Sequence, residues 1–170
     1  MDVLIREERP EDRSAVYKVN RQAFETPAEA DLVDALRPVA DPFLSWVAVV
    51  DGRVVGHILF TPVRIVGEGR ERTALGLAPM AVLPEFQNQG LGSRLVRAGL
   101  DGCRALGHSA VVVLGHAEYY PRFGFEPAAP RGLHYKEASF DPYFFVIGLV
   151  PGGLEGVSGW VEYLPVFEKV

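Results

Sequence analysis

The chain has 170 residues, of which 48% are hydrophobic and 23% are charged, so it holds enough apolar material for a folded core and global disorder is excluded. Its formal net charge of -5 argues against nucleic-acid binding, which requires clustered lysine and arginine. The single cysteine, Cys103, excludes an intrachain disulfide, and its position in an apolar helical pattern predicts a buried structural thiol.

The N-terminal part is predicted to form a strand, two helices and a β-hairpin. Residues 3–6 form the strand. A helix follows over residues 10–24, where proline and two acids suit the positive end of a helix, and a second helix over residues 27–38 ends at its proline. The apolar segments 45–50 and 53–60 flank Asp51-Gly52, which predicts an antiparallel hairpin.

The middle of the chain is predicted to form a second hairpin and then a long helix. A turn at Gly67–Arg70 joins a strand that ends near Val66 to one over residues 73–83. From Gly90 to Gly107, apolar residues recur at helical spacing and predict a helix. Its apolar face consists of Leu91, Leu95, Val96, Gly99, Leu100, Cys103 and Leu106.

The last third is predicted to hold a buried strand and the closing strands of the sheet. Residues 109–114 lack polar alternation, which is typical of a strand covered on both faces. A short helical turn follows around residues 118–122, with further strands at 123–127, 144–150 and 161–166. We interpret the whole as one domain, residues 1–170, with a mixed α+β sheet.

The turn between the 73–83 strand and the long helix predicts an anion site. The amides at a helix start lack intrahelical partners and lie at the positive end of the helix dipole. Gly90 and Gly92 allow a phosphate to approach the backbone, and Ser93 and Arg94 add a hydroxyl and a counter-charge. On the glycines alone, an ordinary turn is the more frequent interpretation.

Two other phosphate-binding motifs do not fit this turn. A P-loop requires a lysine, which Gly92-Ser93-Arg94 lacks. A dinucleotide-binding fold requires a small residue where Leu95 stands and an acidic residue near Val111. Both alternatives are therefore set aside.

The segment Met80–Pro84 followed by Gln87-x-x-Gly90-x-Gly92 resembles the acetyl-coenzyme A signature of the GCN5-related N-acetyltransferases (GNAT). The resemblance covers nearly the whole chain. The C-terminal pattern over residues 154–163 is similar to that of a bacterial subgroup of predicted N-acetyltransferases with poorly defined substrates. The resemblance implies a mostly antiparallel central sheet with helices on both faces and a splayed strand pair for the cofactor.

The resemblance also implies a site. Backbone groups of Met80–Val82 are expected to contact the acetyl and pantetheine arm, and the loop 87–94 to wrap the pyrophosphate. Tyr120 precedes the Gly124-Phe125 pair, where the family is expected to have a proton donor for the departing thiolate; residue type alone favours a packed aromatic turn. The expected cofactor-binding residues are Met80, Ala81, Val82, Gln87, Asn88, Gln89, Gly90, Leu91, Gly92, Ser93 and Arg94.

The sequence does not identify which residue acts as the general base. An amine attacks the thioester, and a lysine-like amine with a pKa of about 10.4 needs a base or a water relay at neutral pH. The candidates are Glu25, Glu29, Glu85 and His116. His116 stands where the subgroup is expected to have an acidic residue, so no base is transferred from the family.

The predicted function is acetyl-CoA-dependent N-acetyl transfer to a primary amine; the alternative is a non-catalytic acyl-CoA-binding sensor or interaction module. The acceptor is a small molecule or a protein amine, and the oligomeric state is open, with a homodimer among the options. No metal is expected, because the four histidines lack paired spacing. An acidic start and short apolar stretches predict a cytoplasmic protein with no membrane partner.

Overall fold

The structure is a computed structural model that describes residues 1–67 and 69–170. The predicted turn at Gly67–Arg70 includes Glu68, which lies outside the described residues. The chain divides into two compact units. The first unit comprises Met1–Thr61, Ala78–Gly102 and Pro165–Val170, and the second comprises Pro62–Leu77 and Cys103–Leu164.

The secondary structure is a mixed set of strands and helices. The strands are β1 (Val3–Glu7), β2 (Leu44–Val50), β3 (Arg53–Gly67), β4 (Arg70–Val82), β5 (Ala110–Leu114), β6 (Glu126–Pro127), β7 (Leu133–His134), β8 (Phe144–Gly148) and β9 (Gly159–Glu162). The α-helices are α1 (Arg13–Ala23), α2 (Ala28–Leu36) and α3 (Leu91–Ala105). Short 3-10 helices span Pro10–Asp12, Pro84–Phe86, Tyr120–Phe123, Ala129–Arg131, Ala138–Tyr143 and Pro165–Lys169.

The strands hydrogen-bond in the order β1-β2-β3-β4-β5-β8-β6, and β9 pairs with both β3 and β7. The pairs β1–β2, β2–β3, β3–β9, β5–β8 and β6–β8 are antiparallel, whereas β4–β5 and β7–β9 are parallel. The parallel β4–β5 pair joins only Leu75 to Val111 and Gly76 to Val112, although β4 continues to Val82 and β5 to Leu114. The predicted mixed, mostly antiparallel sheet with a splayed strand pair is confirmed.

In the first unit, the predicted hairpin and helices are confirmed. Asp51 and Gly52 have φ of 50° and 83°, the positive values that a tight two-residue hairpin turn requires. Four apolar residues of α2 are buried, because the helix places them on one face. They are Ala30, Leu32, Val33 and Leu36.

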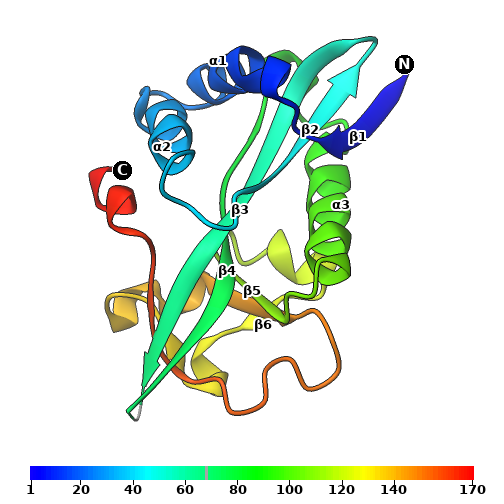
Figure 1. Ribbon diagram of the computed structural model, residues 1–170. Coiled ribbons are helices and arrows are strands. Elements are labelled where there is room, and N and C mark those ends of the chain that lie inside the picture. Colours follow the sequence, from blue (N-terminus) through cyan, green and yellow to red (C-terminus); the bar gives the residue numbers. More distant parts are fainter. Residues whose placement is uncertain (68) are drawn as a thin grey trace. The chain divides into compact units, whose positions relative to one another are not determined.

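Helices cover both faces of the β2–β3 hairpin (Figure 1). On one face, α3 packs closely because it has glycines at the contacts: a Cβ on Gly99 would lie 2.4 Å from Phe60, and one on Gly102 would lie 2.2 Å from Trp46. On the other face, Asn20 of α1 contacts His57 of β3. Alternation along β3 thus directs neighbouring side chains to different helices.

In the second unit, β5 is the central strand. Its residues Ala110 to Val113 are buried, as predicted, and it pairs antiparallel with β8 over Ala110↔Gly148 to Leu114↔Phe144. Strand β6 pairs with the other edge of β8. The core of this unit contains Val63, Ile65, Val112, Ala128, Leu133, Phe144, Val146 and Val161.

Three sequence-based expectations need correction. Leu106 is 56% exposed, because α3 ends at Ala105 before the turn at Gly107. The strand expected over 123–127 shrinks to β6, since the 3-10 helix Tyr120–Phe123 occupies its start. The strand expected over 161–166 instead spans β9, because Pro165 cannot donate to a ladder and begins a 3-10 helix.

Candidate functional site

The turn before α3 is held in place by side-chain amides. The Gln87 side chain donates from Nε2 to the Val82 carbonyl oxygen at 2.9 Å, and the Gln89 side chain donates to the Glu85 carbonyl at 3.2 Å. The Gln87 backbone amide donates to the Pro84 carbonyl at 3.3 Å. The turn is therefore fixed to the end of β4 by its own glutamines.

This turn presents a run of backbone amides that are unpaired within the residues that the structure describes. Asn88 and Gly90 have φ of 62° and 83°, and Gly90 accepts the first helical hydrogen bond of α3 from the Arg94 amide at 3.1 Å. Within the described part of the chain, the amides from Asn88 to Ser93 donate no backbone hydrogen bond. Because these amides also lie at the positive end of α3, the turn is suited to bind an anion.

The predicted residues at the end of β4 lie directly beside this turn. The Leu83 amide donates to the Val55 carbonyl at 2.8 Å, which ties the strand end to β3. Ala81 is buried, and Met80 and Val82 are half-buried. The Gln87–Val82 hydrogen bond thus brings together the two groups of residues that the sequence resemblance singled out.

Tyr120 belongs to the second unit and is packed among aromatic rings. It is 8% exposed and forms edge-to-face contacts with Tyr119 and Phe125 at centroid distances of 5.1 and 5.6 Å. Gly115 permits this position, because a Cβ there would lie 2.4 Å from the Tyr120 ring. Burial, with a smaller effect of Tyr119, raises the pKa of Tyr120 to about 12.

The Tyr120 hydroxyl keeps its hydrogen-bonding capacity. It forms no hydrogen bond with any residue that the structure describes. With its raised pKa, the group is protonated throughout the neutral pH range. Tyr120 can therefore act as a proton or hydrogen-bond donor.

The four base candidates differ in burial. Glu25, Glu85 and His116 are exposed. Glu29, on α2, has one carboxylate oxygen that is buried and that lacks a hydrogen-bond partner among the described residues. A buried acceptor without a donor is unusual in a folded protein. Glu29 is thus the candidate with an unsatisfied group inside the protein.

Sequence reasoning missed a buried chain of polar side chains in the first unit. Asn20 donates from Nδ2 to the Val16 carbonyl and to Nδ1 of His57, each at 3.0 Å. The His57 ring therefore carries its hydrogen on Nε2, which donates to Ser45 Oγ at 3.0 Å. Ser45 then donates to Glu8 Oε1 at 2.5 Å. Each member thus donates to the next, although Oδ1 of Asn20 is buried and has no hydrogen-bond partner among the described residues.

The charged end of this chain is neutralised, and its histidine is kept neutral. The Glu8 side chain is 5% exposed, and its second oxygen lies 2.7 Å from Nη2 of Arg37. Burial, with a smaller effect of the Arg37 charge, lowers the pKa of His57 to about 3. No periodic pattern signals this chain, because its members come from α1, β2, β3 and the residue that follows β1.

The remaining sequence expectations concern metals, membranes and the cysteine. Among the described residues, no group of three or more His, Cys, Asp or Glu could hold a metal ion. In the same part of the chain, no helix has both the length and the apolar character to cross a membrane. Cys103 is buried and free, as predicted, and burial raises the pKa of its thiol to about 12.

A mixed sheet with a splayed parallel pair and a helix start that is suited to bind an anion is the arrangement expected of the GNAT class of acyltransferases. A family model described as an acetyltransferase (GNAT) domain matches residues 4–128. The chain belongs to this GNAT family of N-acetyltransferases.

Relatives and solved structures agree with this assignment. The chain is 40% identical over 168 residues to the uncharacterized N-acetyltransferase YhbS of Escherichia coli K12, covering 98% of this chain and 99% of that protein. The crystal structure of E. coli YhbS in complex with CoA superposes with a TM-score of 0.89 at 41% identity, covering 98% of this chain and 92% of that one. A GNAT acetyltransferase of Brucella melitensis in complex with acetyl-CoA gives a TM-score of 0.79 at 36% identity, covering 98% of both chains.

Proposed function

We propose that residues 1–170 act as a single domain that transfers an acetyl group from acetyl-CoA to a primary amine by direct attack on the thioester. The observation that carries this proposal is the run of unpaired amides from Asn88 to Ser93 at the start of α3. The complexes of E. coli YhbS with CoA and of the B. melitensis enzyme with acetyl-CoA support it.

The residues of the turn fit a pyrophosphate. Unpaired amides provide donors for its oxygens, and the positive φ of Gly90 opens the turn without a side chain in the way. Arg94 is exposed and forms no ion pair with the described residues, so its guanidinium is free to face a negative charge. Backbone groups of Met80–Val82 are assigned to the acetyl and pantetheine arm.

Acetyl-CoA supplies the thioester carbonyl and the thiolate leaving group. As the C–S bond breaks, Tyr120 donates a proton to this sulfur, since its hydroxyl is protonated and has no competing partner among the described residues. Glu29 accepts the proton of the attacking amine, an assignment supported by its buried, unpartnered oxygen. The proposed roles are therefore anion binding by the turn, proton donation by Tyr120 and proton acceptance by Glu29.

Release of free thiol from acetyl-CoA with a panel of metabolite amines and peptides tests the proposed transfer. We expect release with at least one primary amine, together with a mass increase of the acceptor by one acetyl group. Tight CoA binding without thiol release from any acceptor would instead indicate the non-catalytic binding module.

Tyr120→Phe tests the acid role. We expect kcat to fall about 100-fold, a typical effect of removing a general acid, while the Kd of CoA changes less than twofold. Tyr119→Phe is the matched control, because it removes a hydroxyl from the neighbouring ring. Equal turnover of Tyr120→Phe and wild type would remove Tyr120 from the mechanism.

A further inference from the structure

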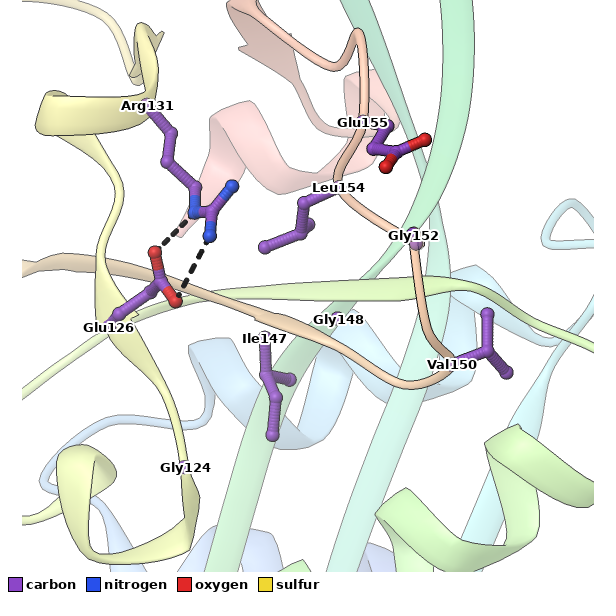
Figure 2. A pocket seen from close by; sticks show the side chains of 10 residues that line it. Gly124, Glu126, Arg131, Ile147, Gly148, Val150, Gly152, Leu154 and Glu155 are labelled. Carbon is purple, nitrogen blue, oxygen red and sulfur yellow. Dashed lines mark hydrogen bonds and ion pairs between the residues drawn. The ribbon is translucent and has the colours of Figure 1, made fainter.

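The second unit contains a cavity of about 470 Å³ beside one edge of β8. Figure 2 shows Glu126 and Arg131 on one side of this cavity, with Leu154 and Glu155 on the other. Its size is within the range of ligand-binding pockets. Leu154 and Glu155 begin the C-terminal pattern that the sequence singled out and that the acetyl-transfer chemistry does not use.

The register of β8 leaves one peptide unit at its outer edge without a partner. On the side of β5, the carbonyl of Tyr143 accepts from the Gly115 amide, and the amide of Leu149 donates to the Ser109 carbonyl, both at 2.8 Å. Because hydrogen bonding alternates along an antiparallel pair, the odd-numbered residues of β8 direct their backbone groups toward β5. The even-numbered residues therefore face the other edge. Accordingly, Phe144 accepts there from the Ala128 amide at 3.0 Å.

Gly148 is the even-numbered residue that β6 does not reach. Strand β6 pairs with β8 only at Glu126↔Val146 and Pro127↔Phe145. The next residue along that register is Gly124, but its amide donates to the Pro121 carbonyl at 3.1 Å and its φ is 100°. Among the described residues, no backbone hydrogen bond of Gly148 on this side is present, and Gly148 lines the cavity.

The charges around the cavity favour a cationic partner. Arg131 forms an ion pair with Glu126, drawn as dashed lines in Figure 2, and this pair is neutral overall. Glu155 is exposed, and its carboxylate forms no hydrogen bond or ion pair with the residues that the structure describes. One unbalanced negative charge therefore belongs to the residues that line the cavity.

We propose that this cavity binds an extended polypeptide segment that carries a basic side chain. The segment adds to the edge of β8 through the N–H and C=O of Gly148, and its basic side chain pairs with Glu155. Unpaired edge groups are a recurrent template for such strand addition, and flanking charges select the sequence. The proposal is independent of acetyl transfer, because the binding groups belong to a different part of the fold from the amide turn.

The test uses the full-length protein and a fluorescein-labelled pentapeptide of threonine, valine, arginine, valine and threonine with both ends blocked. This probe has no primary amine, so its binding does not depend on acetylation. We expect saturable binding, and slower hydrogen exchange of the Gly148 amide in the bound state. Glu155→Lys should weaken binding about fivefold, the size of a partly exposed charge interaction and its reversal.

The control variant Glu118→Lys makes the same charge change on an exposed residue outside the cavity and should leave binding unchanged. A pentapeptide with glutamate in place of arginine should bind Glu155→Lys better than wild type. Binding of free arginine amide as tightly as the pentapeptide, with unaltered exchange at Gly148, would overturn strand addition. Equal binding by Glu155→Lys and wild type would overturn the role of the charge.

Discussion

Two polar regions of the first unit are built in opposite ways. Within the described residues, the turn before α3 leaves the backbone donors from Asn88 to Ser93 without backbone partners, and Asn88, Gln89 and Gly90 are exposed. The chain from Asn20 through His57 and Ser45 to Glu8 is buried, and each member donates to the next. Unpaired groups near water remain available to a ligand, whereas paired groups in the core stabilise the fold.

Changes in the buried chain should therefore alter stability, and changes in the turn should alter affinity for CoA. The two regions lie in the same unit, so each provides a control for the other. A change that moved both quantities together would show that this division does not hold.

His57→Leu should give the largest effect. Leucine fills the buried site with an apolar side chain but leaves the Asn20 amide and the Ser45 hydroxyl without one partner each, so we expect a loss of about 3 kcal/mol in the free energy of unfolding. Urea titration measures this loss. The Kd of CoA for the folded protein should stay within twofold of wild type, and a loss below about 1 kcal/mol would contradict a stabilising role for the chain.

Gly90→Ala should act mainly on affinity. A Cβ on Gly90 meets nothing within 4 Å, but φ of 83° is unfavourable for alanine by about 1–2 kcal/mol, so the turn is expected to relax and misalign its amides. We expect the Kd of CoA to rise about tenfold by isothermal titration calorimetry.

Gly52→Ala is the matched control for this change. Gly52 has the same φ of 83° and the same open surroundings, but it lies in the β2–β3 hairpin. Its substitution should cost similar stability and leave the Kd of CoA unchanged. A similar increase in Kd for both variants would show that the effect of Gly90→Ala comes from lost stability and not from the turn.

The free energy of unfolding should fall on mild acidification because of His57. Its pKa is about 3 in the folded protein and about 6.5 when unfolded, so the unfolded state alone takes up a proton between these values. The stability that the neutral ring contributes is present above pH 6.5 and is lost as the pH falls toward 3. Between pH 7 and pH 5.5 we expect a loss of about 1 kcal/mol.

The comparison of wild type with His57→Gln isolates this contribution, since both proteins share all other titrating groups. Urea titration at the two pH values should show a smaller decrease for His57→Gln, by about 1 kcal/mol. The same decrease in both proteins would mean that His57 does not set the acid sensitivity.

The sequence predicted the parts of the fold that rest on local patterns. The hairpin at Asp51-Gly52 depends on two residues that tolerate positive φ, and α3 and β5 follow from the spacing of their apolar residues. The bounds of the closing strands were predicted less accurately. Their lengths depend on the turn at Gly124 and on Pro165, which act against the apolar pattern.

The turn before α3 was predictable for the same reason, because its donors are backbone groups of consecutive residues, and its binding of an anion stays a prediction. The chain through His57 and the open edge at Gly148 were not predictable, since both depend on strand register and on side chains far apart in sequence. The acceptor amine, the cytoplasmic location and a homodimer stay predictions, because no local pattern encodes them.

Arg94→Gln should give the smallest effect and separates the two contributions to anion binding in the turn. The guanidinium is exposed, so solvent and salt screen its charge and we expect the Kd of CoA to rise about threefold. The affinity of the variant for CoA should also depend less on salt concentration, because the backbone amides remain and only the charge of the Arg94 guanidinium is lost. Arg97→Gln, one turn further along α3, should leave both quantities unchanged, since the positive end of a helix acts only within its first turn. A larger loss for Arg94→Gln than for Gly90→Ala would mean that the side chain, and not the backbone, holds the anion.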